Sequence, residues 1–265
     1  MIFKGARKTN QDQHVVDPTP AEMSPAAREA LRSYTPARIG LERTGVSLAT
    51  GPLLDFQLAH ARARDAVRAA MDVRMMCDEL RRHGLPVLAL KSQAGDRSTY
   101  LRRPDLGRRL SENSATVLKP GEYDVLFVIA DGLSALAVEK HALHLLRTIL
   151  PMIAGWRLAP VCVVEQGRVA VGDAIGEALH APLAVMLIGE RPGLTSPDSL
   201  GVYITWEPRS GRKDAERNCI SNIREEGLSY AAAASRLHYY MDEAARRHMT
   251  GLGIKDPAED LAQLL

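Results

Sequence analysis

The sequence has 265 residues, of which 46% are hydrophobic, and carries a formal net charge of +2 at pH 7. A chain of this size and composition can bury a full core, in one large domain or in a main domain with a smaller one, without disulfides or metal. The near-neutral charge argues against nucleic acid as a partner. No apolar run approaches the roughly 18 to 20 residues of a transmembrane helix, so no membrane association is expected.

The cysteines indicate neither a disulfide framework nor a metal site. Cys77, Cys162 and Cys219 lie far apart and form no CxxC or Cys/His ligand spacing, so we expect no disulfides and no metal ligands. Reduced thiols are typical of a cytoplasmic protein. The polar residues 1–20 contain no apolar secretory segment and are predicted to be a flexible leader.

Residues 21–115 are expected to form a small helical N-terminal region. A short helix is predicted over 26–33 and a long helix over 54–83, where apolar residues recur every three or four positions before Gly84 and Pro86. The other faces of the long helix carry many arginines. Such a face is usually solvated, the alternative being a surface that docks on an acidic partner.

From residue 116 to 250, short apolar runs alternate with helical segments. The runs DVLFVIA, APVCVVE, PLAVMLIG and LGVYITW predict four strands. Helices are predicted after Ser134, which we expect to act as an N-cap, and over 229–248; the stretch 168–180 reads as a short extended piece followed by a helix. The fold class is therefore α/β, with a mostly parallel, Rossmann-like sheet flanked by helices, and residues 251–265 form a C-terminal tail.

Three of the predicted strands end in polar or glycine residues, at 131–132, 165–167 and 189–190. Because ligands bind beyond the carboxyl ends of parallel strands, we expect a binding site where these ends converge. No motif supplies its chemistry, since the G-x-G-x-x-G and P-loop patterns are absent. Ser134 lacks the G-x-S-x-G elbow of a hydrolase, and His141 and His144 are expected to be ordinary helical histidines.

Four separated motifs, YLRRPDLGRRL, ADGLSA, IGERPGLTSPDSLG and DAERNCISNI, resemble the small subunit of ethanolamine ammonia-lyase. The resemblance extends from Thr35 to Gly251. It implies an adenosylcobalamin-dependent lyase that converts ethanolamine to acetaldehyde and ammonia. In that family a large TIM-barrel subunit binds ethanolamine and performs the radical chemistry, and the small α/β subunit covers the cofactor within a higher hetero-oligomer. The resemblance thus implies an enzyme component that is active only with its large subunit.

The resemblance also implies three cofactor contacts, on Val169 in GRVAVGD, Glu190 in IGERPG and Cys219 in RNCISN. Residue type alone would single out none of them, since Glu190 could equally be a structural carboxylate and the other two could be core residues. A buried carboxylate can accept a charge-assisted bond of about 1.5–3 kcal/mol from a corrin amide. The chain lacks the D-x-H-x-x-G pattern that gives a histidine to cobalt, and we expect it to supply no catalytic residue.

The alternative is a stand-alone α/β module that binds another ligand or has a regulatory role, with no lyase partner. A cytoplasmic location is expected for either protein. No amphipathic targeting helix is evident in residues 1–20, which argues against encapsulation in a bacterial microcompartment.

Overall fold

The computed structural model describes residues 24–35 and 37–255. The predicted leader at 1–20 and most of the tail at 251–265 lie outside the described residues. The chain divides into two units, Met1–Leu53 and Leu54–Leu265. In the first unit, the predicted short helix is confirmed as α1 (Pro25–Tyr34), whose N-cap Ser24 accepts a hydrogen bond from the backbone of Ala27. A two-stranded antiparallel hairpin follows, made of β1 (Arg43–Thr44) and β2 (Ser47–Leu48).

The prediction of one long helix over 54–83 is wrong, because α2 (Thr50–Arg68) and α3 (Val73–Arg82) are separate helices. Asp72 begins the second helix, since its carboxylate accepts a hydrogen bond of 2.9 Å from the Met75 N–H. The break between the helices places Met71 in the hydrophobic core. The arginines of the two helices are exposed, as expected of a solvated face: Arg62, Arg64, Arg68, Arg74, Arg81 and Arg82.

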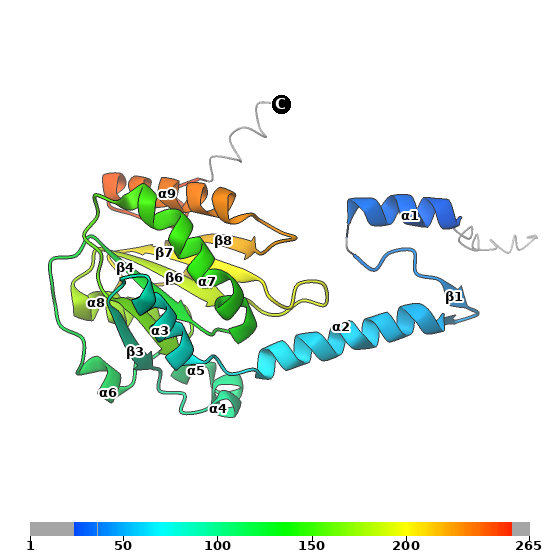
Figure 1. The fold of residues 1–265 in the computed structure, drawn as a ribbon, viewed down its shortest axis with the longest axis horizontal. Coiled ribbons are helices and arrows are strands. Elements are labelled where there is room, and N and C mark those ends of the chain that lie inside the picture. The colour runs from blue at the N-terminus through cyan, green and yellow to red at the C-terminus, as the bar shows by residue number, and fades with distance from the viewer. Residues whose placement is uncertain (1–23, 36, 256–265) are drawn as a thin grey trace, which may run out of the picture. The chain divides into compact units, whose positions relative to one another are not determined.

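Six strands form the main sheet, in the order β3-β5-β4-β6-β7-β8 (Figure 1). The strands β3 to β6 are parallel, whereas β7 and β8 pair antiparallel. The predicted mostly parallel α/β sheet is therefore confirmed. The bounds are β3 (Val87–Lys91), β4 (Val125–Ala130), β5 (Val161–Glu165), β6 (Leu183–Gly189), β7 (Leu200–Trp206) and β8 (Asn218–Ile223).

Two strands were not predicted from the sequence. The edge strand β3 lies within 21–115, where only helices were expected, and its five residues are too few to show a clear period. In β8 three of the six residues are exposed, so polar side chains interrupt the apolar run that marks the central strands. The return from β6 to β7 contains no helix, which suits an antiparallel pair because a parallel one needs a long crossover.

Helices cover both faces of the sheet. The helices α3, α7 (Ala135–Ile149) and α9 (Tyr230–Arg247) pack on one face, and α8 (Val171–Leu179) packs on the other. All six residues of β4 are buried, alternately toward the two faces, which explains its unbroken apolar sequence. The expected extended piece before α8 is wrong, since a turn precedes that helix.

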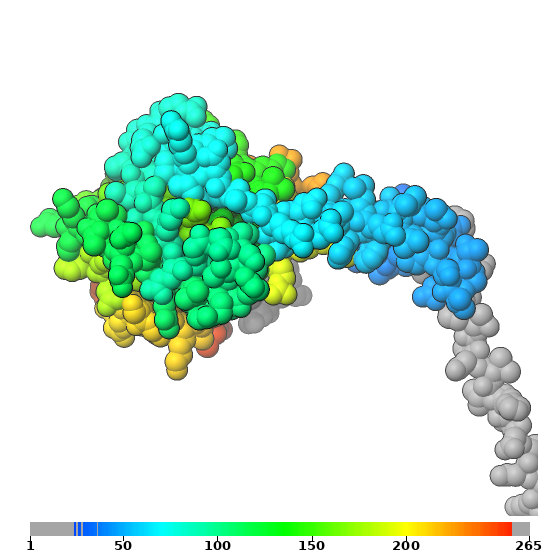
Figure 2. Space-filling model, turned by 90° about the horizontal axis from the view of Figure 1, so that it is seen from below, coloured from blue at the N-terminus to red at the C-terminus, as the bar shows by residue number. Residues whose placement is uncertain are grey.

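Short helices complete the second unit, and on the side seen in Figure 2 the segment from α3 to α6 fills much of the surface of the α/β fold. None of the helices in the described part of the chain has the length and apolarity needed to cross a bilayer. The remaining elements are α4 (Arg97–Arg102), α5 (Pro104–Gly107), α6 (Glu112–Ala115), and the 3-10 helices η1 (Leu150–Ile153) and η2 (Asp214–Glu216).

Candidate functional site

The carboxyl ends of β4, β5 and β6 form the topological switch point of the sheet. The strands β5 and β6 lie on either side of β4, and they are reached by α7 on one face and by α8 on the opposite face. The chain therefore leaves β4 toward one face of the sheet and leaves its neighbour β5 toward the other face. A crevice opens between the ends of two such strands, and α/β proteins bind ligands there. The predicted convergence of strand ends is confirmed, because Gly167 N–H donates to Asp131 Oδ1 at 3.0 Å and Leu133 N–H donates to Gly189 O at 2.9 Å.

Two glycines allow the backbone loops to approach each other at this edge. Gly132 has a φ of +54°, and a Cβ there would lie 2.3 Å from Gly189 O. A Cβ on Gly189 would lie 2.0 Å from Ser134 O. Ser134 is the N-cap of α7, as predicted, and its hydroxyl also donates to Pro197 O at 2.8 Å. Ser134 therefore serves the backbone, and the hydrolase interpretation finds no support.

A cleft of about 440 Å³ lies at this edge, and we call it the strand-end cleft. Val169 lines it from the turn before α8, and Glu190 lines it directly after β6. Tyr203 of β7 lines it as well, and Cys219 of β8 is the cross-strand partner of Tyr203. The structure thus brings Val169 and Glu190 into one cleft, and it places Cys219 next to the cleft residue Tyr203. The lining consists of Tyr100, Gly132, Leu133, Arg168, Val169, Ile188, Gly189, Glu190, Arg191 and Tyr203.

The half-buried carboxylate of Glu190 connects three strands. Ser199 lies directly before β7, and its hydroxyl donates to Glu190 Oε2. The backbone N–H of Asn222, in β8, donates to the same oxygen at 3.2 Å. Gly201 leaves room for this carboxylate, since a Cβ there would lie 2.9 Å from Oε1. No described residue donates a hydrogen bond to Oε1. Glu190 is thus held in place through one oxygen and keeps an acceptor on the other.

The remaining two predicted residues offer uncharged surface. Val169 is half-buried and packs against the core cluster on the α8 side of the sheet. The Cys219 side chain reaches solvent, and its Sγ lies 3.3 Å from Ser221 Oγ. Surrounding protein atoms raise the pKa of the Cys219 thiol, against the opposing effect of its hydrogen bonds to Ser221 and Tyr203. This thiol therefore stays protonated at neutral pH and presents a neutral sulfur.

An ion pair that sequence reasoning missed contacts the strand-end loops beside the cleft. The Asp131 side chain is fully buried, and Arg97 Nη1 lies 3.4 Å from its Oδ2. The same guanidinium donates to Gly132 O at 2.8 Å and, through Nε, to Val67 O at 2.8 Å. Burial raises the pKa of Asp131 to about 6, although the positive charge of Arg97 opposes this shift. No local sequence signal marks Arg97, because its partners are distant in the chain.

Two arginines share one aromatic ring in the lining of the cleft. The Cζ atoms of Arg97 and Arg168 lie 4.9 Å and 4.5 Å from the centroid of the Tyr100 ring. The Tyr100 hydroxyl is buried and donates to Gly167 O at 3.1 Å. Cation–π contacts of this kind stabilise a guanidinium by about 0.5–2 kcal/mol, and they also hold the turn that carries Val169.

The described residues contain no group of three or more His, Cys, Asp and Glu side chains that could hold a metal ion. The helical histidines have structural contacts instead. His141 Nδ1 lies 2.6 Å from the Tyr230 hydroxyl, and the His144 ring stacks on the Tyr230 ring with centroids 5.4 Å apart.

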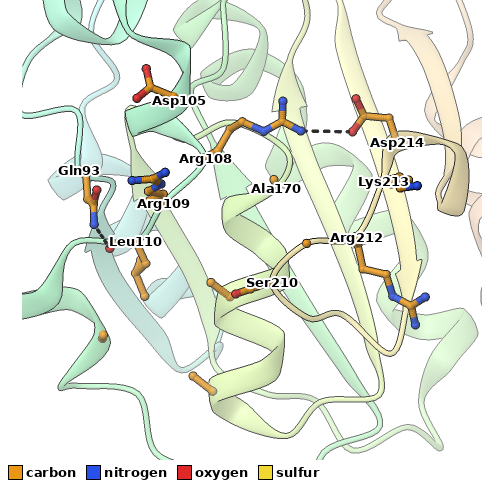
Figure 3. A pocket seen from close by; sticks show the side chains of 14 residues that line it. Gln93, Asp105, Arg108, Arg109, Leu110, Ala170, Ser210, Arg212, Lys213 and Asp214 are labelled. Carbon is orange, nitrogen blue, oxygen red and sulfur yellow. Dashed lines mark hydrogen bonds and ion pairs between the residues drawn. The ribbon is translucent and has the colours of Figure 1, made fainter.

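A larger cleft, of about 890 Å³, lies beside the outer face of α8, and we call it the helix-face cleft (Figure 3). Figure 3 shows Arg108 and Asp214 facing each other, with 3.9 Å between Nη2 and Oδ1. None of the residues predicted from the sequence to bind a ligand lines this cleft. Its charged lining residues are Asp105, Arg108, Arg109, Arg212, Lys213 and Asp214.

The family model of the ethanolamine ammonia-lyase light chain (EutC) matches residues 25–255. The chain belongs to this family. It is 57% identical over 237 residues to the ethanolamine ammonia-lyase small subunit of Pseudomonas aeruginosa (strain LESB58), a match that covers 86% of this chain and 87% of the relative. It is 56% identical over 251 residues to the corresponding subunit of Azotobacter vinelandii, with 92% of each chain covered. A small subunit of ethanolamine ammonia-lyase is a component of a lyase complex.

Proposed function

We propose that this chain covers adenosylcobalamin at the interface with the large TIM-barrel subunit, which binds ethanolamine and performs the reaction. The observation that carries the proposal is the position of Val169, Glu190 and the Tyr203–Cys219 pair around one cleft at the switch point of the sheet. The membership of the chain in the ethanolamine ammonia-lyase light chain family supplies the cofactor class.

The side chains of the strand-end cleft suit this cofactor. Cobalamin has a rim of neutral amides, which need acceptors when they are buried, around a largely apolar ring. Glu190 Oε1 is such an acceptor, and its orientation is fixed before binding by Ser199 and Asn222 on Oε2. Val169, Tyr203 and the protonated Cys219 offer uncharged surface. The donor and acceptor set therefore fits the group.

The size of the cleft supports an interfacial location. A volume of about 440 Å³ falls within the range of about 300–1,000 Å³ that holds drug-sized ligands. Cobalamin is larger than such ligands, so a substantial part of it would remain outside this chain and would need a second protein surface. The large subunit is the partner that the family implies.

The division of labour follows from these contacts. Adenosylcobalamin, when bound, supplies the radical that starts the reaction. The residues of this chain bind the cofactor through Glu190, orient it against the fixed strand ends, and exclude water from the side that they cover. We assign no proton transfer to any residue of this chain.

The proposal includes assembly into a higher hetero-oligomer in the cytoplasm, without a microcompartment. A tagged form of the chain, isolated from its native host, should bring down a larger chain together with a corrin absorbance spectrum. Light scattering of the eluate then gives the mass of the assembly. A chain that elutes alone and colourless, with cobalamin present in the medium, would instead favour the stand-alone module.

A further inference from the structure

Two arginines flank the proposed cofactor contacts in the sequence and in space. Arg168 directly precedes Val169, and Arg191 directly follows Glu190. Both arginines line the strand-end cleft, and both also line an adjoining cleft of about 470 Å³ that shares Leu133. Arg168 and Arg191 therefore lie where the two clefts meet.

Neither of these arginines is held in an ion pair by a described residue. Within the part of the chain that the structure describes, no carboxylate forms an ion pair with Arg168 or Arg191. The buried arginines elsewhere are paired, since Arg97 contacts Asp131 at 3.4 Å and Arg217 contacts Asp173 at 2.6 Å.

Arg168 is the more enclosed of the two cations. Its guanidinium lies over the Tyr100 ring, and its Nε is buried without a hydrogen-bond partner. Arg97, on the same ring, adds a second positive charge, while the single nearby buried carboxylate, Asp131, is already paired with it. Buried polar groups of this kind normally have partners. The charged residues that line the cleft are Arg168, Arg191 and Glu190, so positive charge exceeds negative charge by one, and an anion would offset this excess.

We propose that Arg168 and Arg191 bind the phosphodiester of the cobalamin nucleotide tail. The inference rests on the proposed function, because it assigns one group of the same cofactor to a second set of residues. A planar guanidinium donates two parallel hydrogen bonds to phosphate oxygens. In the resulting division, Glu190 accepts from neutral amides, and the two arginines of the cleft neutralise the phosphodiester of the nucleotide tail.

The test compares ligands that differ by the phosphate, using the assembled complex with its large subunit. The three probes are cyanocobalamin, cobinamide phosphate and cobinamide, which keeps the ring but lacks the phosphate and the nucleotide. Equilibrium dialysis, read by absorbance, gives the Kd of each probe for the wild type and for the variants Arg168→Met and Arg191→Gln.

We expect the wild-type complex to bind cobinamide phosphate more tightly than cobinamide. Arg168→Met should weaken binding of the two phosphate-containing probes by about 10- to 100-fold, the factor that one charge-assisted hydrogen-bond partner contributes. It should change the Kd of cobinamide by less than about twofold. Arg191→Gln should also weaken only the phosphate-containing probes, but by a smaller factor in Kd, because Arg191 is exposed.

Two results would overturn the inference while leaving the proposed function intact. One is equal weakening of all three probes by Arg168→Met, which would make Arg168 a support for the cleft. The other is an absence of any preference for cobinamide phosphate in the wild type. Binding of none of the probes by the wild-type complex would contradict the proposed function itself.

Inorganic phosphate distinguishes the cofactor from a separate phosphate compound as the occupant. Excess phosphate that weakens cyanocobalamin binding in the wild type, but not in Arg168→Met, supports a shared site. If the wild-type complex binds phosphate and cyanocobalamin at the same time, and Arg168→Met abolishes the phosphate binding, the assignment to the nucleotide tail is overturned.

Arg109→Gln is the matched control, because Arg109 lines the helix-face cleft (Figure 3) and has no role in the proposal. It should leave all three Kd values unchanged. If Arg168→Met does not fold, Arg168→Lys keeps the positive charge and the contact with Tyr100 but loses the bidentate fork. Its effect should again be confined to the phosphate-containing probes.

Discussion

The strand-end cleft and the helix-face cleft differ in how they are held together. The helix-face cleft is larger, yet its ion pairs include local ones such as Arg212 with Glu216, four positions apart at 2.6 Å. In the strand-end cleft the contacts join segments distant in the sequence, as between Arg97 and Asp131 or between Glu190 and Asn222. The helix-face cleft has a long-range pair too, Arg108 with Asp214, but that pair is exposed, whereas Arg97 and Asp131 are buried. Burial of the long-range contacts, more than volume, therefore distinguishes the candidate site.

The largest effect should come from Gly189→Ala, which attacks the backbone packing of the strand-end cleft. The new Cβ would lie 2.0 Å from Ser134 O and 2.6 Å from Asp131 O, both backbone atoms that cannot move independently. We expect the free energy of unfolding to fall by about 4 kcal/mol or more, in the range of severe steric defects. Urea denaturation followed by circular dichroism measures this loss.

Gly172→Ala is the matched control for that substitution. Gly172 lies in α8, and its Cβ would make an ordinary contact of 3.5 Å with Met186 Sδ. Because alanine favours helix over glycine by about 1 kcal/mol, this variant should be as stable as the wild type or slightly more so. If Gly172→Ala lost as much unfolding free energy as Gly189→Ala, the strand ends would be no less tolerant of an added methyl group than helix α8.

Arg97→Met removes one partner of the buried ion pair. It leaves the Asp131 carboxylate buried without its cation, and we expect a loss of about 3 kcal/mol at pH 8, typical of a broken buried pair. The loss should be smaller at pH 5, where Asp131 is protonated. Arg108→Gln, which breaks the exposed pair with Asp214 in the helix-face cleft, should leave the denaturation midpoint nearly unchanged. Equal losses would remove the contrast between the clefts.

The raised pKa of Asp131 predicts a specific pH dependence. Its folded-state pKa of about 6 exceeds the ordinary value of 3.8, so the folded protein binds a proton more readily than the unfolded chain. This group therefore adds stability as the pH falls from about 6 to about 4, by about 1–3 kcal/mol. The variant Asp131→Asn cannot take up that proton. The wild-type unfolding free energy, measured relative to that of the variant, should therefore rise over this interval, and a constant difference would contradict the shift.

Glu190→Gln should have the smallest effect on the fold and a selective effect on the ligand. The amide oxygen of the new side chain can still accept from Ser199 and Asn222, as Oε2 does. Its NH₂ then replaces Oε1 and presents a donor to the N–H of a corrin amide. We expect the cobalamin Kd of the complex to rise about tenfold, or about 1.4 kcal/mol, with subunit association unchanged in a pull-down.

The control for this variant is Glu177→Gln. Glu177 also accepts a backbone N–H, from Ser210 at 3.0 Å, but it lies beside the helix-face cleft. The cobalamin Kd of the complex that carries Glu177→Gln should equal that of the wild-type complex. An unchanged Kd in Glu190→Gln would remove Glu190 from the proposed contacts.

Part of the candidate site was predictable, through two different signals. The ends of three apolar runs located the edge of the sheet. Motif resemblance singled out Val169 and Glu190 at that edge, and Cys219, which pairs with the cleft residue Tyr203. The supporting groups Arg97 and Tyr100 were missed. Their partners lie more than thirty positions away, as for Arg97 with Asp131 and Tyr100 with Gly167, and no local pattern reports such contacts.

The sequence by itself determined the fold class, the four central apolar strands, the Ser134 cap and the helix at Tyr230–Arg247, because local periodicity and capping chemistry decide these features. Only the tertiary structure decided the break before α3, the addition of β3 and β8 to the sheet edges, and the antiparallel direction of β7. It alone decided that Ser199 and Asn222 orient one oxygen of Glu190 and leave the other open. The reason is physical, since edge pairing and side-chain orientation depend on groups that the fold brings together from distant parts of the chain.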